Sequence, residues 1–274
     1  TPLLTDFYLV VLSRENRHMK LMAIREITEI RSIAAFPDML ALFKMPDFRH
    51  KYEIVKYFAV VKDRRAVQPL MTYLLENSHD SRAMEVLEAL AAIKDPSVVE
   101  PLIAFMNSSD HMEIKAKTAE TLGILGDSMA APALLSQLKK SKTITDPRTK
   151  ADFQQVVASS AIALGQLKEA SAVTPLINAA NATGYDKSFR RSYLNSKKAA
   201  AWALGEIGDQ SCLDTLKMLA ETHRPARENT IYDDTEVYLA ATAAIDKLTK
   251  EDGQTRPTRY VSMCGNVVPV GEIK

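Results

Sequence analysis

The sequence is poor in the residues that build metal sites and disulfide-rich folds. Its 274 residues include two cysteines, Cys212 and Cys264, and neither belongs to a CxxC motif or a Cys/His array. A zinc site is therefore not expected, and whether the two cysteines pair stays open. There is also no HExxH motif, no glycine-rich phosphate loop and no GxSxG turn. We accordingly expect no catalytic residue, no metal and no cofactor.

Charge of one sign and long apolar runs are equally scarce. Lysine and arginine total 35, aspartate and glutamate total 34, and the formal net charge is +1 at pH 7. Nucleic-acid-binding domains usually carry a clear basic excess, so this balance disfavours a dedicated nucleic-acid binder. The apolar stretch FYLVVL (7–12) is much shorter than the roughly 20 residues of a membrane span. Because the first residue is Thr1, a removed leader is possible, and both compartment and oligomeric state stay open.

What the chain does contain is a repeated pattern. An acidic residue recurs between two apolar stretches, first at intervals of 32 residues and then at 42 and 40. These acidic turn residues are Asp63, Asp95, Asp127, Glu169 and Asp209. The best copies are LAAIKDPSVVEPL (90–102), LGILGDSMAAPAL (122–134), LGQLKEASAVTPL (164–176) and LGEIGDQSCLDTL (204–216).

Each copy predicts a pair of helices. The acidic side chain caps a helix start by accepting a backbone N–H, and a proline follows in or near the first turn. Apolar residues then recur every three or four positions, which is typical of an amphipathic helix, here called helix A. An alanine-rich helix B precedes the next acidic residue and often ends at a glycine that can adopt positive φ. The small residues of helix B predict close approach between neighbouring helices.

The helix B pattern, AxALGxIGD followed by AVxPL, resembles the HEAT-like repeats of phycobilisome-lyase-type proteins. The match is best at 201–209, 122–127 and 164–176, and the resemblance extends over roughly 17–250. It implies an all-α fold, a right-handed α-α superhelix of about six helical pairs whose helix B lines the concave surface and binds another protein. Iron-binding hydroxylases of similar fold carry repeated His-Glu pairs, and this sequence contains none.

The expected organisation is one solenoid domain over 1–252, with an N-terminal cap at about 1–31 and an irregular tail at 253–274. Three later repeats are longer because residues are inserted between helix A and helix B. We expect longer inter-helix loops that stack into a ridge at one edge, although neutral loop growth is an alternative. The ridge segments are 139–153, 181–198 and 222–238. The net charge is about +3 over 139–153, +4 over 184–198 and −3 over 221–236.

The candidate site follows from the position seven residues before the acidic turn residue, called position −7. It holds Lys56, Glu88 and Glu120 in earlier repeats, then Ile162, and Trp202 in the repeat after that. A position that is charged three times is not expected in a core, so we place Trp202 on the concave surface. Cover by a long loop is the alternative for Trp202, and covering the core end is the alternative for Phe189 and Tyr193. The predicted partner-binding residues are Trp202, Lys198, Glu206, Arg190, Arg191, Tyr193, Phe189, Lys56, Glu88 and Glu120.

The sequence thus predicts a non-enzymatic scaffold that binds a protein partner through the helix B face and the loop ridge. One alternative is an accessory subunit of a chromophore-lyase-like or chaperone-like complex. Another is a nucleic-acid-binding HEAT-like protein that uses the basic part of the ridge, 139–198.

Overall fold

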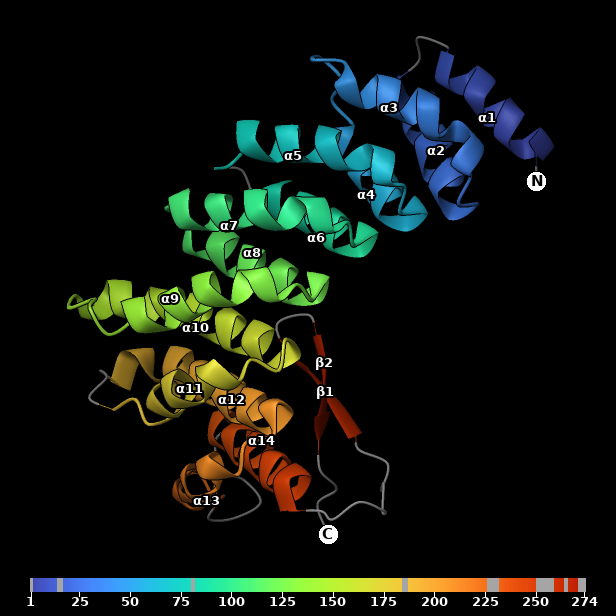
Figure 1. Ribbon diagram of the computed structural model, residues 1–274. Coiled ribbons are helices and arrows are strands. Elements are labelled where there is room, and N and C mark those ends of the chain that lie inside the picture. Colours follow the sequence, from blue (N-terminus) through green and yellow to red (C-terminus); the bar gives the residue numbers. More distant parts are fainter. Residues whose placement is uncertain are drawn as a thin grey trace. The chain divides into compact units, whose positions relative to one another are not determined.

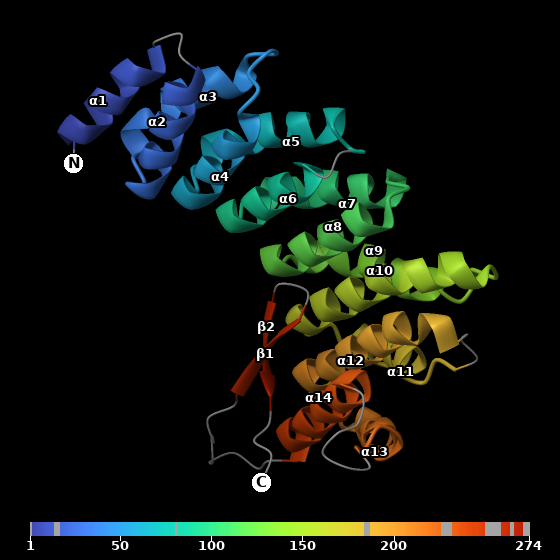
Figure 2. The ribbon, with the colours of Figure 1, turned by 180° about the vertical axis from the view of Figure 1, so that it is seen from behind.

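The structure is a computed structural model in which the chain forms two compact units, Thr1–Phe105 (unit 1) and Met106–Lys274 (unit 2). Figures 1 and 2 show the ribbon from two opposite sides. The residues whose structure is described are 2–13, 17–79, 82–183, 187–225, 232–249, 259–263 and 266–270. No helix within these ranges is both long and apolar enough to cross a membrane.

Unit 1 is built from antiparallel helix pairs. In each pair the second helix packs on its counterpart in the next pair, so that α2, α4 and α6 follow one another in one layer. Short 3-10 turns, η1 (Ile33–Ala35), η2 (Arg64–Ala66) and η3 (Pro96–Val98), lead into the first helix of the following pair. The helices are α1 (Pro2–Ser13), α2 (Arg17–Glu29), α3 (Phe36–Lys44), α4 (Lys51–Val61), α5 (Val67–Glu76) and α6 (Arg82–Ile93). Helix α7 (Val99–Ser108) lies at the boundary between the units.

Unit 2 continues the same plan with longer helices. Its B helices α8, α10, α12 and α14 pack side by side, and its A helices α9, α11 and α13 form a second layer. The turns are η4 (Ser128–Ala130), η5 (Ala170–Ala172), η6 (Lys187–Phe189) and η7 (Gln210–Cys212). The helices are α8 (Met112–Leu125), α9 (Ala131–Lys140), α10 (Pro147–Gln166), α11 (Val173–Ala180), α12 (Arg190–Ile207), α13 (Leu213–Thr222) and α14 (Tyr232–Thr249).

The predicted all-α, HEAT-like architecture is confirmed. Among the described residues, α1 pairs with α2, α3 with α4 and α5 with α6 in unit 1, and α9 pairs with α10, α11 with α12 and α13 with α14 in unit 2. The α1/α2 pair falls within the predicted cap at 1–31. The cores consist of aliphatic and aromatic side chains from both layers, of which Phe36, Tyr57, Phe58 and Phe153 are the largest. Cys212 is buried and free, whereas Cys264 lies outside the described residues.

The acidic turn residues cap as the sequence predicts. Asp95 accepts the backbone N–H of Ser97 at 2.9 Å, and Asp209 accepts that of Ser211 at 2.8 Å. Asp63, Asp127 and Glu169 make the equivalent bond. In each case the capped element is the 3-10 turn, and helix A begins directly after it. Since these bonds satisfy N–H groups that have no intrahelical partner, they fix the start of each repeat.

Helix B ends in a left-handed residue in each repeat from α4 to α12. Gly126 and Gly208 adopt φ of 76° and 83°, as the Gly-Asp pattern predicts. Three lysines take the same conformation where the sequence has no glycine, Lys62, Lys94 and Lys168, with φ between 52° and 57°. The repeat is therefore defined by its backbone turn, and glycine is one way of making it.

Glycines inside the B helices mark their closest approaches. A β-carbon on Gly123 of α8 would lie 2.7 Å from Cα of Ala163 of α10, and one on Gly205 of α12 would lie 2.7 Å from Cβ of Ala244 of α14. Real Cβ contacts are essentially never this short, so these positions have no room for a side chain. The alanine-rich composition of helix B is thus explained by glycine-to-alanine contact between successive B helices.

The predicted long loops are in large part helical. Helix α10 has 20 residues and both α12 and α14 have 18, compared with 11 for α4 and 12 for α6. About half of each segment therefore lengthens helix B at its N-terminus. The reason is clearest at α10, where Asp146 accepts the N–H of Thr149 at 2.7 Å and Pro147 occupies the first turn. This cap starts the helix inside the segment expected to be loop.

The tail also differs from the prediction of irregular structure. Strands β1 (Arg259–Met263) and β2 (Asn266–Val270) pair antiparallel, with Val261 opposite Val268, and β2 lies against α14. β-branched residues favour extended backbone, which accounts for strands in a segment without helical periodicity. The hairpin is drawn beside α14 in Figures 1 and 2.

Candidate functional site

Position −7 of helix B is exposed in unit 1 and buried or half-buried in unit 2. Lys56 and Glu88 are exposed, as predicted. Glu120 is buried, and its Oε1 lies 3.3 Å from Nζ of Lys117 one turn earlier. Ile162 is buried as well. The prediction that Glu120 belongs to an exposed binding face is therefore wrong. The close packing of α8 and α10 leaves little of the helix B face around Glu120 open to solvent.

Trp202 is half-buried rather than freely exposed. A β-carbon on Gly165 of α10 would lie 3.0 Å from Cζ3 of Trp202, so the indole rests in the space that this glycine leaves. Its Nε1 is buried and has no hydrogen-bond partner in the described structure. Trp202 therefore packs partly between α12 and α10, and only part of the ring is available to a partner.

Three predicted partner-binding residues of α12 form ion pairs with α14. Arg190 pairs with Asp234, Nζ of Lys198 lies 2.5 Å from Oε2 of Glu236, and Oε2 of Glu206 lies 2.6 Å from Nζ of Lys247. These pairs run along one side of α12, at its start, middle and end. The charges of these three side chains are thus largely compensated within unit 2, by partners that are 38 to 44 residues away in the sequence.

Asp234 gathers further groups around the start of α14. Oδ1 of Asp234 lies 2.9 Å from Nδ1 of His223, while Arg190 bonds to Oδ2. Lys197 is buried nearby; burial lowers the pKa of its ammonium group, and the charge of Asp234 acts in the opposite direction. The one sequence signal for this cluster is the alternation of a basic and an acidic insertion in successive repeats.

The aromatic residues of the second insertion differ in burial. Tyr193 is buried, and burial raises the pKa of its hydroxyl. Its assignment to the partner-binding surface is therefore wrong, and it covers the end of the core because the extended part of α12 packs on α10. Next to it, Oγ of Ser196 bonds to Oε1 of Gln154 at 2.8 Å. Phe189 is partly exposed and Arg191 is exposed.

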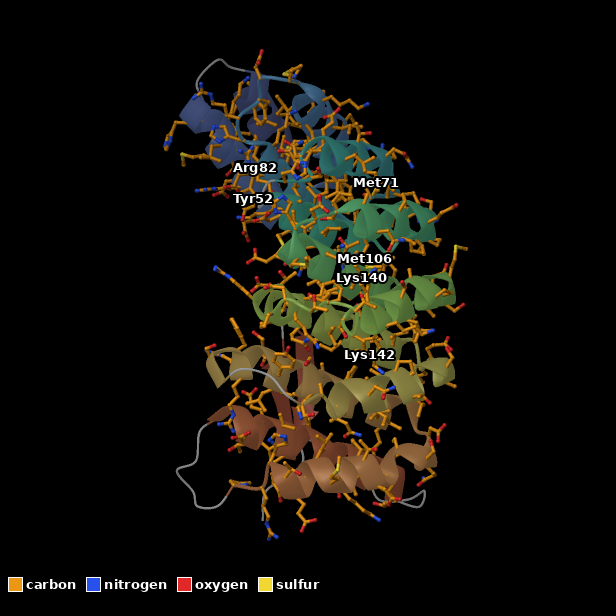
Figure 3. All side chains as sticks on the ribbon, turned by 90° about the vertical axis from the view of Figure 1, so that its left-hand side faces the viewer. Tyr52, Met71, Arg82, Met106, Lys140 and Lys142 are labelled. Carbon is orange, nitrogen blue, oxygen red and sulfur yellow. The ribbon has the colours of Figure 1, made fainter. Side chains whose placement is uncertain are left out.

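The first insertion gives a different surface, which we call the basic edge. It comprises the end of α9, the turn after it and the first turn of α10. Asp146, the acidic residue in its middle, is engaged as the cap of α10. Figure 3 shows Lys140 and Lys142 at this edge of unit 2. The basic edge consists of Lys139, Lys140, Lys142, Arg148 and Lys150.

Comparison with protein families identifies two segments. Residues 76–151 match HEAT repeats, and residues 197–222 match the PBS lyase HEAT-like repeat. No curated protein matches the chain.

Two solved structures are similar to the chain at low sequence identity. The complex of CpcE and CpcF of phycocyanin lyase from Nostoc sp. PCC7120 is 17% identical, with a TM-score of 0.48 over 89% of this chain and 94% of that chain. Human deoxyhypusine hydroxylase in complex with glycerol is also 17% identical, with a TM-score of 0.38 over 89% of this chain and 95% of that chain. Residues 76–151 and 197–222 are thus HEAT-like repeats, the second of the phycobilisome-lyase type, and the repeating caps and stacked helix pairs follow the same plan in the rest of the described helices.

Proposed function

We propose that the chain is a non-enzymatic protein-interaction module, and that the helix B face of unit 1 takes part in binding its partner. The observation that carries this proposal is the difference between the units at position −7. In unit 1 the packing of successive B helices leaves charged side chains exposed at this position, whereas in unit 2 Glu120 and Ile162 are buried and Trp202 is half-buried. Exposed groups on rigid, packed helices are suited to binding with little loss of conformational freedom.

The side chains of this face are held in place by one another. Nη2 of Arg25 on α2 lies 2.9 Å from Oε1 of Glu53 on α4, and Nζ of Lys56 lies 3.9 Å from Oε2 of the same carboxylate. The ammonium group of Lys56 also lies 4.1 Å from the ring centre of Tyr52. Glu88 extends the row to α6. The face therefore presents both signs of charge in a fixed order, which favours a charge-complementary protein partner.

A charge-reversal experiment tests the proposal. The full chain, immobilised, captures proteins from a lysate of its source, and the double variant Lys56→Glu/Glu88→Lys is compared with Lys44→Glu/Glu100→Lys. The control reverses equal charges on exposed positions of the A helices α3 and α7. We expect the control to retain the bound protein and the helix B variant to lose most of it. Equal retention by both folded variants rejects this face.

A second candidate function is an accessory subunit of a chromophore-lyase-like complex. It is favoured by the family match at 197–222, which covers the end of α12 and all of α13. The test is to mix the chain with a bilin and candidate partner subunits and to follow the visible absorbance. A spectral change that depends on this chain supports the candidate, and an unchanged spectrum counts against it.

A further inference from the structure

The three insertions do not contribute equally to the charge of the surface. The basic second insertion and the acidic third insertion neutralise each other through the Arg190–Asp234 and Lys198–Glu236 pairs. The first insertion has no acidic counterpart in this arrangement. Its positive charge therefore stays at the basic edge, and the surface charge of the ridge is local rather than continuous.

The lysines of the basic edge have no ion-pair partner among the described residues. Lys139, Lys140 and Lys142 are exposed, and none of them lies within 4.0 Å of a carboxylate there. Neither acidic residue of the segment pairs with these lysines in the described structure: Asp146 caps α10, and Asp152 lies in the second turn of that helix. The excess of positive charge is thus not compensated within the edge itself.

A buried lysine adds to this charge. Lys115, near the start of α8, is only 4% exposed and forms no ion pair in the described structure. Burial lowers the pKa of its ammonium group, the charge of Lys140 lowers it further, and Asp110 opposes both effects. The charge of the exposed Lys140 therefore acts on a buried ammonium group. An anion bound from outside would relieve their repulsion.

The backbone holds these lysines in a defined position. After α9, the N–H of Lys142 bonds to the carbonyl of Lys139 at 3.2 Å, and the N–H of Thr143 bonds to that of Lys140 at 3.0 Å. Oγ1 of Thr143 bonds to the same carbonyl at 2.8 Å. The turn that carries the three lysines is therefore hydrogen-bonded throughout, which lowers the entropic cost of binding through it.

We propose that the basic edge, together with Lys115, docks an acidic segment of the partner protein; this inference rests on the proposed interaction function and names the chemistry of the partner. A carboxylate-rich peptide fits better than a nucleic acid. The edge is a short cluster, and the one aromatic residue of 139–153, Phe153, is buried and provides no surface for stacking a base. Acidic side chains need only complementary charge within reach of the lysines.

The test uses three probes and two variants of the full chain. A fluorescein-labelled oligoglutamate peptide, an oligolysine peptide and a single-stranded oligonucleotide are titrated by fluorescence anisotropy at low and at physiological salt. The edge variant is Lys139→Glu/Lys140→Glu/Lys142→Glu. The control is Lys44→Glu/Arg49→Glu/Lys217→Glu, which changes the net charge equally at exposed sites elsewhere. We expect the edge variant to bind oligoglutamate about tenfold or more weakly, and the control to bind within about twofold of the original chain.

Three results overturn the inference: no binding of oligoglutamate at low salt, equal weakening in both variants, or tighter binding of the oligonucleotide than of the peptide. Failure here is distinguishable from failure of the proposed function. If the edge variant still captures the protein that the Lys56→Glu/Glu88→Lys variant loses, the interaction function stands and the acidic-segment inference does not.

Discussion

A β-carbon placed on Gly165 of α10 would lie 2.8 Å from Cα of Ala203 on α12. The atom it would meet belongs to the backbone of the next B helix, so rotation of a side chain cannot make room. This close approach recurs at Gly123 and Gly205, which face Ala163 and Ala244.

We therefore predict that Gly165→Ala destabilises unit 2. In an exposed helix interior the same change would stabilise by up to about 1 kcal/mol, because alanine has the higher helix propensity. Here the clash requires α10 and α12 to separate, and overpacking of this kind costs about 1–3 kcal/mol. Urea unfolding measures the change in the free energy of unfolding. Since propensity and packing give opposite signs, a stabilised Gly165→Ala variant would refute the close contact.

The left-handed lysines give a second prediction. Lys62, Lys94 and Lys168 hold positive φ, which a residue with a β-carbon adopts at a cost of about 1 kcal/mol. Replacing each by glycine removes this cost, while the greater freedom of glycine in the unfolded chain offsets part of the gain. We expect each Lys→Gly substitution to be neutral or to stabilise, by at most about 1 kcal/mol.

The control for this prediction is Gly208→Ala, which introduces a β-carbon at φ of 83°. It should lower the midpoint of thermal unfolding. If Lys94→Gly lowers the midpoint as much as Gly208→Ala does, the positive φ of Lys94 is not what determines its effect.

The repeat could be predicted from the sequence because its determinants are local. Asp95 and Asp209 each accept a hydrogen bond from the backbone N–H of the residue two positions later. The spacing of glycine and alanine in helix B is periodic. The long loops were predicted wrongly where a local signal was overlooked. Asp146 followed by Pro147 is a helix-start signature, and it begins α10 inside the expected loop.

Most of the candidate site could not be predicted in this way, because its contacts join distant parts of the chain. Arg190 and Asp234 are 44 residues apart, and nothing near Arg190 in the sequence indicates that its charge is paired. Tyr193 belongs to a basic, aromatic segment that fits a binding surface or a core edge equally well. Only the packing of α12 on α10 determines that it is buried.

The caps predict a dependence of stability on acid. Hydrogen bonds from Ser97 lower the pKa of Asp95, and hydrogen bonds from Ser171 lower that of Glu169. A carboxylate with a lowered pKa in the folded state stabilises fully above its unfolded value, which is about 4. That stabilisation is lost as the pH falls through the folded value. We expect the urea midpoint to be constant near neutral pH and to fall below about pH 4.

Asp95→Asn isolates the contribution of one cap. Asparagine still accepts the N–H of Ser97 but does not titrate, so the acid-dependent loss should be smaller in the variant than in the original chain. Asp95→Ala should cost about 1 kcal/mol at neutral pH. If Asp95→Asn loses as much stability in acid as the original chain, other carboxylates determine the acid sensitivity.

Asp234 and Glu236 are predicted to differ sharply in importance. Asp234→Asn removes the carboxylate charge that pairs with Arg190 and acts on the buried Lys197, and it changes the group in contact with Nδ1 of His223. Breaking a buried pair from one side is strongly destabilising, and for this partly exposed carboxylate we expect a loss of about 2 kcal/mol. Glu236→Gln removes a more exposed partner of Lys198 and should cost about 0.5 kcal/mol. Similar losses from both variants, measured by urea unfolding, would contradict the central role of Asp234.

Substitutions at Trp202 distinguish a role of its ring in packing from a role in binding a partner. Because its ring occupies the space above Gly165, Trp202→Ala should leave a cavity and destabilise unit 2 by about 3 kcal/mol. Trp202→Phe keeps an aromatic ring and removes the unpartnered Nε1, so its loss of stability should be smaller. Thermal unfolding followed by far-UV circular dichroism measures both variants. An unchanged midpoint in Trp202→Ala would show that the ring contributes little to packing and would restore the interpretation of Trp202 as a free binding group.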